Sequence, residues 1–209
     1  AWSVATYLEN RCEDSLLAVL PFSFDYGFSQ LSTAFHSGAR VVLLNYLVPG
    51  DILRAAQRDR ITGIAGVPPL WIQLARLEWP AEVARDLRYL TNSGGRMPAN
   101  ALHELRQRLP GTRVFLMYGL TEAFRSTYLA PEQVGTRPTS IGKAIPGAEV
   151  LVVRPDGTEC GPNEPGELVH RGALVARGYW RDPDSTAERF RPAPGQLPGV
   201  PLPDMAVWS

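Results

Sequence analysis

The chain has 209 residues, 44% of them hydrophobic, and its formal net charge is zero. It is therefore long enough to bury one large core or two small ones, and no net charge draws it to nucleic acid or to anionic lipid. No apolar run approaches the ~20 residues that span a membrane. Cys12 and Cys160 are too few for a disulfide framework and suit a reducing compartment, so we expect a cytoplasmic protein. No zinc site is expected, because His36, His103 and His170 lack cysteine or acidic neighbours at ligand spacing.

The first two-thirds of the sequence alternates short apolar runs with segments of helical period. Strands are expected at Ser15–Leu20, Ala39–Leu44, Ile61–Val67, Leu87–Thr91 and Arg113–Tyr118. Helices are expected at Tyr26–His36, Gly50–Asp59 with Asp51 available as its cap, Pro69–Leu77 opened by proline, and Pro98–Leu109. This alternation predicts an α/β fold with a layered, largely parallel sheet and helices on its faces.

The helical period ends near Ala130. Alternating segments at Glu149–Arg154 and Glu167–His170, joined by turn clusters, follow it, and the last residues from Met205 are strand-like. This pattern predicts a small antiparallel, β-barrel-like unit. Residues 1–130 are therefore expected to form an α/β subdomain and residues 131–209 a mainly β subdomain. Residues 192–203, rich in proline and glycine, are expected to form a loop.

The strongest local motif is Met117–Ala123, at the end of the last expected parallel strand. Ligands of parallel α/β sheets bind beyond the carboxyl ends of the strands. Tyr118 offers a flat face for a base, and Gly119 lets the backbone approach a ligand. Thr121 supplies a hydroxyl for phosphate, and Glu122 is a hard oxygen ligand for magnesium. Taken alone, the motif is also compatible with a strand end followed by a capped helix.

A second glycine-containing turn, Asn92–Arg96, again lies between a strand and a helix. Its two glycines permit close backbone approach, and the following helix start offers unpaired N–H groups to an anion. It is not a Walker A loop, because no Gly-Lys-Ser/Thr follows. Taken alone, such a pair is more often a tight turn.

In combination, these motifs resemble the adenylate-forming superfamily, which includes acyl- and aryl-CoA synthetases, nonribosomal-peptide adenylation domains and firefly luciferase. The matching segments are Leu20–Asp25, Gly66–Pro69, Ser93–Gly95, Tyr118–Glu122, Ser140–Gly147, Gly166–Gly172, Ala176–Trp180 and Thr186–Phe190. The resemblance extends over essentially the whole chain.

The resemblance implies a site for ATP, Mg²⁺ and a small-molecule carboxylic acid, with CoA as the co-substrate. It implies that Tyr118 stacks on adenine, with Gly119 beside it, and that Ser93, Gly94 and Gly95 line the adenine and acyl pocket. It further implies that Thr121 contacts the phosphate and that Glu122 holds the magnesium. The acid pocket would be shaped by Phe24, Asp25, Tyr26, Val67 and Pro68.

The resemblance also implies parts that these 209 residues lack. The family's phosphate loop and its mobile C-terminal domain, which carries the catalytic lysine, are absent. Lys143 is the only lysine here, and it matches a structural turn. The chain is therefore expected to be an internal fragment of the family's large N-terminal domain and to be inactive by itself.

Three functions stay open. Met117 and Leu120 favour the acyl-CoA ligase branch, in which an acyl-adenylate passes its acyl group to CoA. Asp25 stands where peptide-synthetase adenylation domains place the carboxylate that binds an amino acid's ammonium group, although a capping role at the next helix is favoured. The third is a catalytically dead module that binds a nucleotide or a partner.

Overall fold

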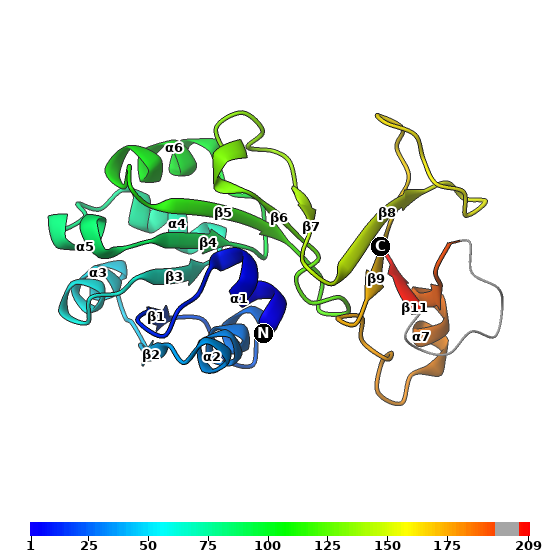
Figure 1. The fold of residues 1–209 in the computed structure, drawn as a ribbon, viewed down its shortest axis with the longest axis horizontal. Coiled ribbons are helices and arrows are strands. Elements are labelled where there is room, and N and C mark those ends of the chain that lie inside the picture. Colours follow the sequence, from blue (N-terminus) through cyan, green and yellow to red (C-terminus); the bar gives the residue numbers. More distant parts are fainter. Residues whose placement is uncertain (195–204) are drawn as a thin grey trace. The chain divides into compact units, whose positions relative to one another are not determined.

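Strands and helices alternate along the first 118 residues (Figure 1). The structure is a computed structural model, and it describes residues 1–194 and 205–209. By contacts the chain divides into two compact units, one of residues 1–118 and 128–142, the other of residues 119–127 and 143–209. These units are interleaved along the chain, and the single subdomain boundary expected after residue 130 stays a prediction.

The first unit contains a largely parallel sheet. Its strands are β1 (Ser15–Ala18), β2 (Arg40–Leu43), β3 (Gly63–Gly66), β4 (Tyr89–Asn92), β5 (Arg113–Tyr118) and β6 (Thr127–Leu129), in the order β2-β1-β3-β4-β5-β6. All pairs from β2 to β5 are parallel. Every residue of β1, β3 and β4 is buried, as expected of central parallel strands covered on both faces, whereas the edge strand β2 is partly exposed.

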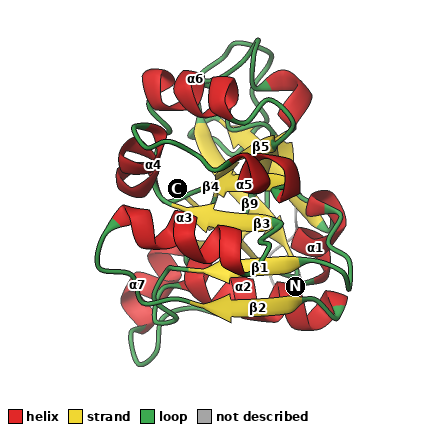
Figure 2. Cartoon of the chain, turned by 90° about the vertical axis from the view of Figure 1, so that its left-hand side faces the viewer, coloured by secondary structure: helices red, strands yellow, loops and turns green. Residues whose placement is uncertain are grey.

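Helices flank this sheet on both faces (Figure 2). They are α1 (Trp2–Leu8), α2 (Asp25–Ser37), α3 (Pro49–Arg58), α4 (Pro68–Ala75), α5 (Ala81–Asp86) and α6 (Ala99–Arg108), followed by the 3₁₀ turn η1 (Pro131–Gln133). Four of the six helices were expected. Helices α1 and α5, of seven and six residues, were not, because two turns or fewer give too short a window for a helical period to be recognised.

Two helix starts differ from the sequence prediction. Phe24, rather than Asp25, is the N-cap of α2, so the capping role favoured for Asp25 is wrong. In α3, Asp51 lies in the first turn and not at the cap. There its carboxylate accepts the backbone N–H groups of Leu47 and Val48 at 2.9 and 3.0 Å. Asp51 therefore does stabilise the start of α3, but its side chain does so from the first turn and not from the N-cap position.

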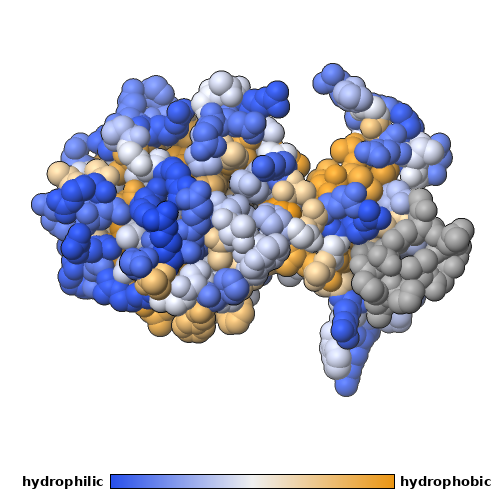
Figure 3. All heavy atoms as spheres, viewed as in Figure 1, coloured by the Kyte–Doolittle hydropathy of each residue, from blue (hydrophilic) through white to orange (hydrophobic). Residues whose placement is uncertain are grey.

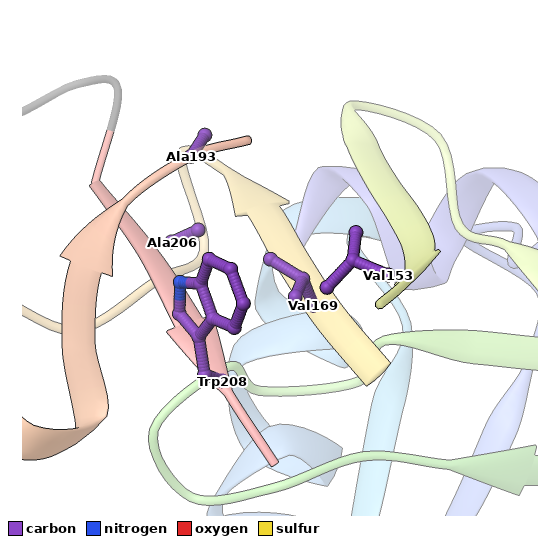
Figure 4. Packing of buried hydrophobic residues seen from close by; sticks show 5 residues of the cluster. All are labelled: Val153, Val169, Ala193, Ala206 and Trp208. Atoms are coloured by element: carbon purple, nitrogen blue, oxygen red, sulfur yellow. The ribbon is translucent and has the colours of Figure 1, made fainter. Parts of the chain in front are cut away.

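The second unit contains the predicted antiparallel sheet. Its strands are β8 (Ala148–Val153), β9 (Glu167–Gly172), β10 (Phe190–Pro192) and β11 (Met205–Trp208), in the order β10-β11-β9-β8. Figure 4 shows Trp208 facing small apolar side chains in its core, namely Val153, Val169, Ala193 and Ala206. The α/β class followed by a small antiparallel sheet is thus confirmed.

The unit also holds the two-residue strand β7 (Lys143–Ala144) and the helix α7 (Pro183–Arg189). The helix was not predicted, although the sequence contains its start signal. Asp182 is the N-cap and accepts the backbone N–H of Ser185 at 3.0 Å, and proline follows at the first helical position. The loop expected over residues 192–203 falls mainly on residues 195–204, which lie outside the described residues.

The surface of the first unit is largely hydrophilic in the view of Figure 3, with apolar residues gathered along its lower edge. Helix α2 lies at that edge in Figure 1 and carries the exposed side chains of Phe28 and Phe35. Within the described part of the chain, no helix combines the length and apolarity needed to cross a membrane.

Candidate active site

The strand order places a topological switch point between β1 and β3. From β1 the chain runs outward to the edge strand β2, then returns to β3 on the other side of β1. Loops leaving the carboxyl ends of β1 and β3 therefore diverge, and ligands of open α/β sheets bind in the crevice between such loops. The loop after β1 leads to Phe24 and Asp25, and β3 is followed directly by Val67 and Pro68.

The glycine turn after β4 lies against both loops. A Cβ at Gly94 would lie 3.4 Å from the Val67 Cγ1 and 3.6 Å from the Phe24 Cζ, and a Cβ at Gly95 would lie 3.1 Å from the Pro68 Cγ. Gly94 has a φ of 74°, a left-handed conformation that glycine adopts without a Cβ penalty. The turn thus has bare backbone where the segments from β1 and β3 converge.

Asn92 fixes the base of this turn. It is the last residue of β4, in register with Gly66 of β3 and with Leu116 of β5. Its buried side chain donates from Nδ2 to the carbonyl of Gly95 at 2.8 Å. Tyr118 ends the neighbouring strand β5 and is half-buried. The carboxyl ends of β3, β4 and β5 consequently lie side by side, with a candidate site segment at each.

Tyr26 is almost completely buried, and its part in shaping the acid pocket stays a prediction. Its side chain is 2% exposed, and its hydroxyl is bonded to Thr91 of β4, to Oγ1 at 2.6 Å and to the carbonyl oxygen at 2.9 Å. It ties α2 to the strand that carries the glycine turn. Phe24, whose ring lies edge-on to that of Tyr26 at 6.1 Å, is the more exposed of the two.

Asp25 is half-buried in the first turn of α2. Its Oδ1 accepts the backbone N–H of Tyr26 at 2.8 Å, and no ion pair to Asp25 is found in the described part of the chain. A half-buried carboxylate is stabilised by a cationic partner. The Asp25 carboxylate is therefore able to pair with a cationic group of a ligand.

Gly119 is the first residue of segment 119–127 of the second unit, and close packing of the backbone requires a glycine there. A Cβ there would lie 2.7 Å from the backbone nitrogen of Arg125, too near for any side chain. The backbone of residues 119–125 thus closes tightly on itself. Thr121 within it is exposed and Glu122 half-buried.

Glu122 is held by its neighbours in the second unit. Its carbonyl accepts the N–H of Ala176 at 2.7 Å, and its Oε1 accepts the hydroxyl of Tyr179 at 2.5 Å. This bond, together with burial, raises the pKa of the Tyr179 phenol above its ordinary value. The sequence had shown Tyr179 only as part of the matching segment Ala176–Trp180, without assigning it a role.

At this segment the chain offers a magnesium ion one carboxylate, that of Glu122. Among residues 1–194 and 205–209, no three His, Cys, Asp or Glu side chains lie close enough together to hold a metal. Mg²⁺ is commonly bound by one or two carboxylates together with substrate phosphates and water. Glu122 therefore fits a magnesium ion that arrives with a nucleotide, and it does not fit an all-protein metal site.

Comparison with known proteins agrees with the fold. The model of the family described as AMP-binding enzyme matches residues 1–180, and the chain belongs to this family. It is 33% identical to 4-coumarate–CoA ligase 3 of Arabidopsis thaliana over 85% of the chain, and 29% identical to bacitracin synthase 3 of Bacillus licheniformis over 87%. The chain spans 33% of the first relative and 3% of the second.

Solved structures are similar over nearly the whole chain. CmiS6 has a TM-score of 0.86 and a sequence identity of 30%, and the match covers 99% of this chain and 51% of that one. VinN in complex with L-aspartate has a TM-score of 0.79 and a sequence identity of 26%, and the match covers 99% of this chain and 52% of that one. O-succinylbenzoate CoA synthetase from Bacillus subtilis, in complex with ATP and a magnesium ion, has a TM-score of 0.82 and 26% identity, covering 99% of this chain and 43% of that one. The relatives thus include CoA ligases and a bacitracin synthase.

Proposed function

We propose that this chain forms the acid- and nucleotide-binding part of an enzyme that activates a carboxylic acid with ATP. A carboxylate oxygen attacks the α-phosphorus, pyrophosphate leaves, and an acyl-adenylate forms. The thiol of CoA, losing its proton, then attacks the acyl carbon, and AMP leaves. The observation that carries the proposal is the convergence of Phe24, Val67 and the Gly94–Gly95 turn at the switch point of the sheet.

The proposed roles follow from what each group can donate or accept. The bare backbone of Gly94 and Gly95 would let a flat base and an acyl chain approach closely. Tyr118, at the adjacent strand end, would offer its ring to adenine. Ser93, 6% exposed at the start of the turn, would line the same pocket. Acid and nucleotide would then meet at one edge of the sheet, as their reaction requires.

The remaining roles concern the phosphates. Thr121 would donate its exposed hydroxyl to phosphate, and Glu122 would hold the magnesium. When bound, magnesium would supply positive charge to the phosphate oxygens, on which charge develops during transfer. The backbone bond from Ala176 to the Glu122 carbonyl keeps this segment in place.

The test is ATP–pyrophosphate exchange by the longer protein that contains this chain, with fatty, aryl and amino acids supplied in turn. The proposal predicts exchange with one acid class and, on addition of CoA, release of AMP and a thioester. If the acyl group is transferred only to a carrier-protein thiol, that thiol and not CoA is the acceptor. A protein that binds ATP but exchanges with no acid would instead be a binding module.

Activation of an amino acid is a second candidate, favoured by Asp25. Its carboxylate is half-buried beside the pocket segments and does not cap α2. VinN, solved with L-aspartate, and bacitracin synthase 3 are similar to this chain. An Asp25→Asn variant separates the two candidates. If an ammonium group is bound there, exchange with amino acids falls steeply; if the substrate is a simple acid, exchange changes little.

A further inference from the structure

Tyr179 makes the one side-chain hydrogen bond recorded for Glu122 in the described part of the chain. The distance from the phenol oxygen to the Glu122 Oε1, 2.5 Å, is at the short end for an O–H···O⁻ bond, which is charge-assisted. Tyr179 thus acts on a carboxylate proposed to hold a metal.

The position of the Tyr179 hydroxyl is fixed from its own side. Its backbone N–H donates to the Thr186 Oγ1 of α7 at 2.9 Å, and Thr186 Oγ1 in turn donates to the carbonyl of Asp182 at 2.6 Å. Its ring lies edge-on to Phe190 with centroids 5.4 Å apart, in a small core with Ala123. The start of α7 and this core therefore locate the hydroxyl before any ligand binds.

Glu122 is located from the other side by its backbone. Its carbonyl accepts the N–H of Ala176, and the next residue, Ala123, forms a bridge with Val175. With the main chain and one carboxylate oxygen held, rotation of the carboxylate is restricted and its second oxygen, Oε2, keeps one orientation. Hydrogen bonds that orient a metal-binding group in this way typically account for 10–100-fold in metal affinity.

We propose that Tyr179 is a positioning residue that orients the Glu122 carboxylate toward the divalent cation of a bound nucleotide. The inference rests on the proposed function, because it requires Glu122 to be a metal ligand. It goes beyond that function by assigning a role to the Tyr179 side chain, which acts through Glu122 and does not itself touch the metal.

The test measures metal binding directly in the longer protein. Free Mn²⁺ is followed by electron paramagnetic resonance in the presence of ATP, for the wild type and for Tyr179→Phe, which keeps the ring against Phe190. We expect the variant to bind Mn²⁺ about 10-fold or more weakly. Pyrophosphate exchange should need correspondingly more Mg²⁺, with the maximal rate largely recovered at saturating metal. Tyr46→Phe, in the loop after β2, serves as the matched control and should change neither value.

A double-mutant cycle separates positioning from general support of the fold. If Tyr179 acts through Glu122, then Glu122→Gln combined with Tyr179→Phe binds Mn²⁺ no more weakly than Glu122→Gln alone. Additive losses, or wild-type Mn²⁺ affinity in Tyr179→Phe, would overturn the inference and leave the proposed function standing. Should Tyr179→Phe fail to fold, Thr186→Ala, which removes the acceptor of the Tyr179 backbone N–H together with the bond to the Asp182 carbonyl, should weaken Mn²⁺ binding in the same direction; unchanged binding would overturn the inference. A wild-type protein that does not bind Mn²⁺ with ATP would overturn the proposed function, and this inference with it.

Discussion

Single residues at the candidate site have their roles set by backbone geometry as much as by side-chain chemistry. Gly94 combines a φ of 74° with contacts to the pocket segments from both sides, whereas a Cβ at Gly111, in the turn before β5, would meet no atom within 4 Å. Gly94 leads from a strand into a helix and Gly111 from that helix into the next strand, and only at Gly94 does the backbone conformation itself favour glycine.

Replacement of Gly94 by alanine should destabilise the chain by about 1–2 kcal/mol, because a Cβ is disfavoured in the left-handed conformation. Urea unfolding of the chain measures this. Gly111→Ala is the matched control and should stay within about 0.5 kcal/mol of the wild type. Equal stability of the two variants would mean that the turn relaxes to another conformation without cost.

Glu122 is the residue whose charge the proposed chemistry needs most. In the longer protein, Glu122→Gln should reduce the maximal rate of pyrophosphate exchange by at least about 100-fold, since it removes charge that acts in the transition state. Thermal unfolding should change little, because a partly exposed carboxylate contributes little stability. Glu188→Gln, on the exposed side of α7, is the control. Near-normal exchange by Glu122→Gln would exclude a metal role.

At the scale of elements, an ion pair connects the starts of three parallel strands. Asp14, 3% exposed just before β1, accepts from Arg88 before β4 at 2.5 and 2.8 Å and from Thr62 before β3 at 2.7 Å. Burial opposes the charge, but the bonds from Arg88 and Thr62 outweigh it and lower the Asp14 pKa. This network lies at the amino ends of the strands, at the edge opposite to the candidate site.

Asp14→Asn should therefore cost about 3–5 kcal/mol of unfolding free energy, because it leaves the Arg88 guanidinium without its buried partner. Asp59→Asn, which removes the partner of the exposed Arg58 side chain, should cost no more than about 1 kcal/mol. Chemical unfolding at neutral pH compares the two. Similar losses would show that burial does not strengthen the Asp14 pair.

His170 makes the stability of the second unit depend on pH. It lies in β9 with 2% of its surface exposed, and burial lowers its pKa to about 4 from an ordinary value near 6.5. Between these values the unfolded chain binds the proton and the folded one does not. Stability should thus be fully present above about pH 6.5 and fall toward pH 4, by at most about 3 kcal/mol.

The measurement is urea unfolding at pH 7 and pH 5 for the wild type, His170→Gln and His103→Gln, the last being exposed on α6. Only His170→Gln should lose part of the pH dependence. Any further loss of stability below about pH 4 should come from carboxylates such as Asp14, whose pKa is lowered in the folded chain.

At the scale of the molecule, the candidate site residues are divided between two units. Phe24, Gly94 and Tyr118 belong to the first, and Thr121 and Glu122 to the second. The only lysine, Lys143, is exposed in β7. A reaction that builds negative charge on phosphate oxygens depends on several cationic and donor groups acting together.

The 209 residues by themselves should consequently show pyrophosphate exchange at least about 100-fold below that of the longer protein, since groups that act as one unit fail together. Both proteins are assayed at equal concentration with the acid that gives the highest exchange. Comparable rates would mean that these 209 residues already hold every group that the adenylation step requires.

The sequence by itself determined the α/β class, the antiparallel sheet and the placement of most long elements, because strand and helix periods are local properties of a chain. It gave β5 with its observed bounds and located both glycine-containing motifs at strand ends. It missed α1, α5 and α7, which are too short for a helical period to be recognised.

Only the tertiary structure decided which neighbours each site residue has. That Phe24 is the cap of α2, that Tyr26 is bonded to Thr91, and that Tyr179 reaches Glu122 across 57 residues are facts of packing. Hydrogen bonds between distant segments leave no periodic trace in a sequence, since either partner taken alone is an ordinary polar residue. The order of the strands, and with it the switch point where Phe24, Val67 and the Gly94–Gly95 turn lie together, likewise depends on pairing between segments that are distant in the sequence.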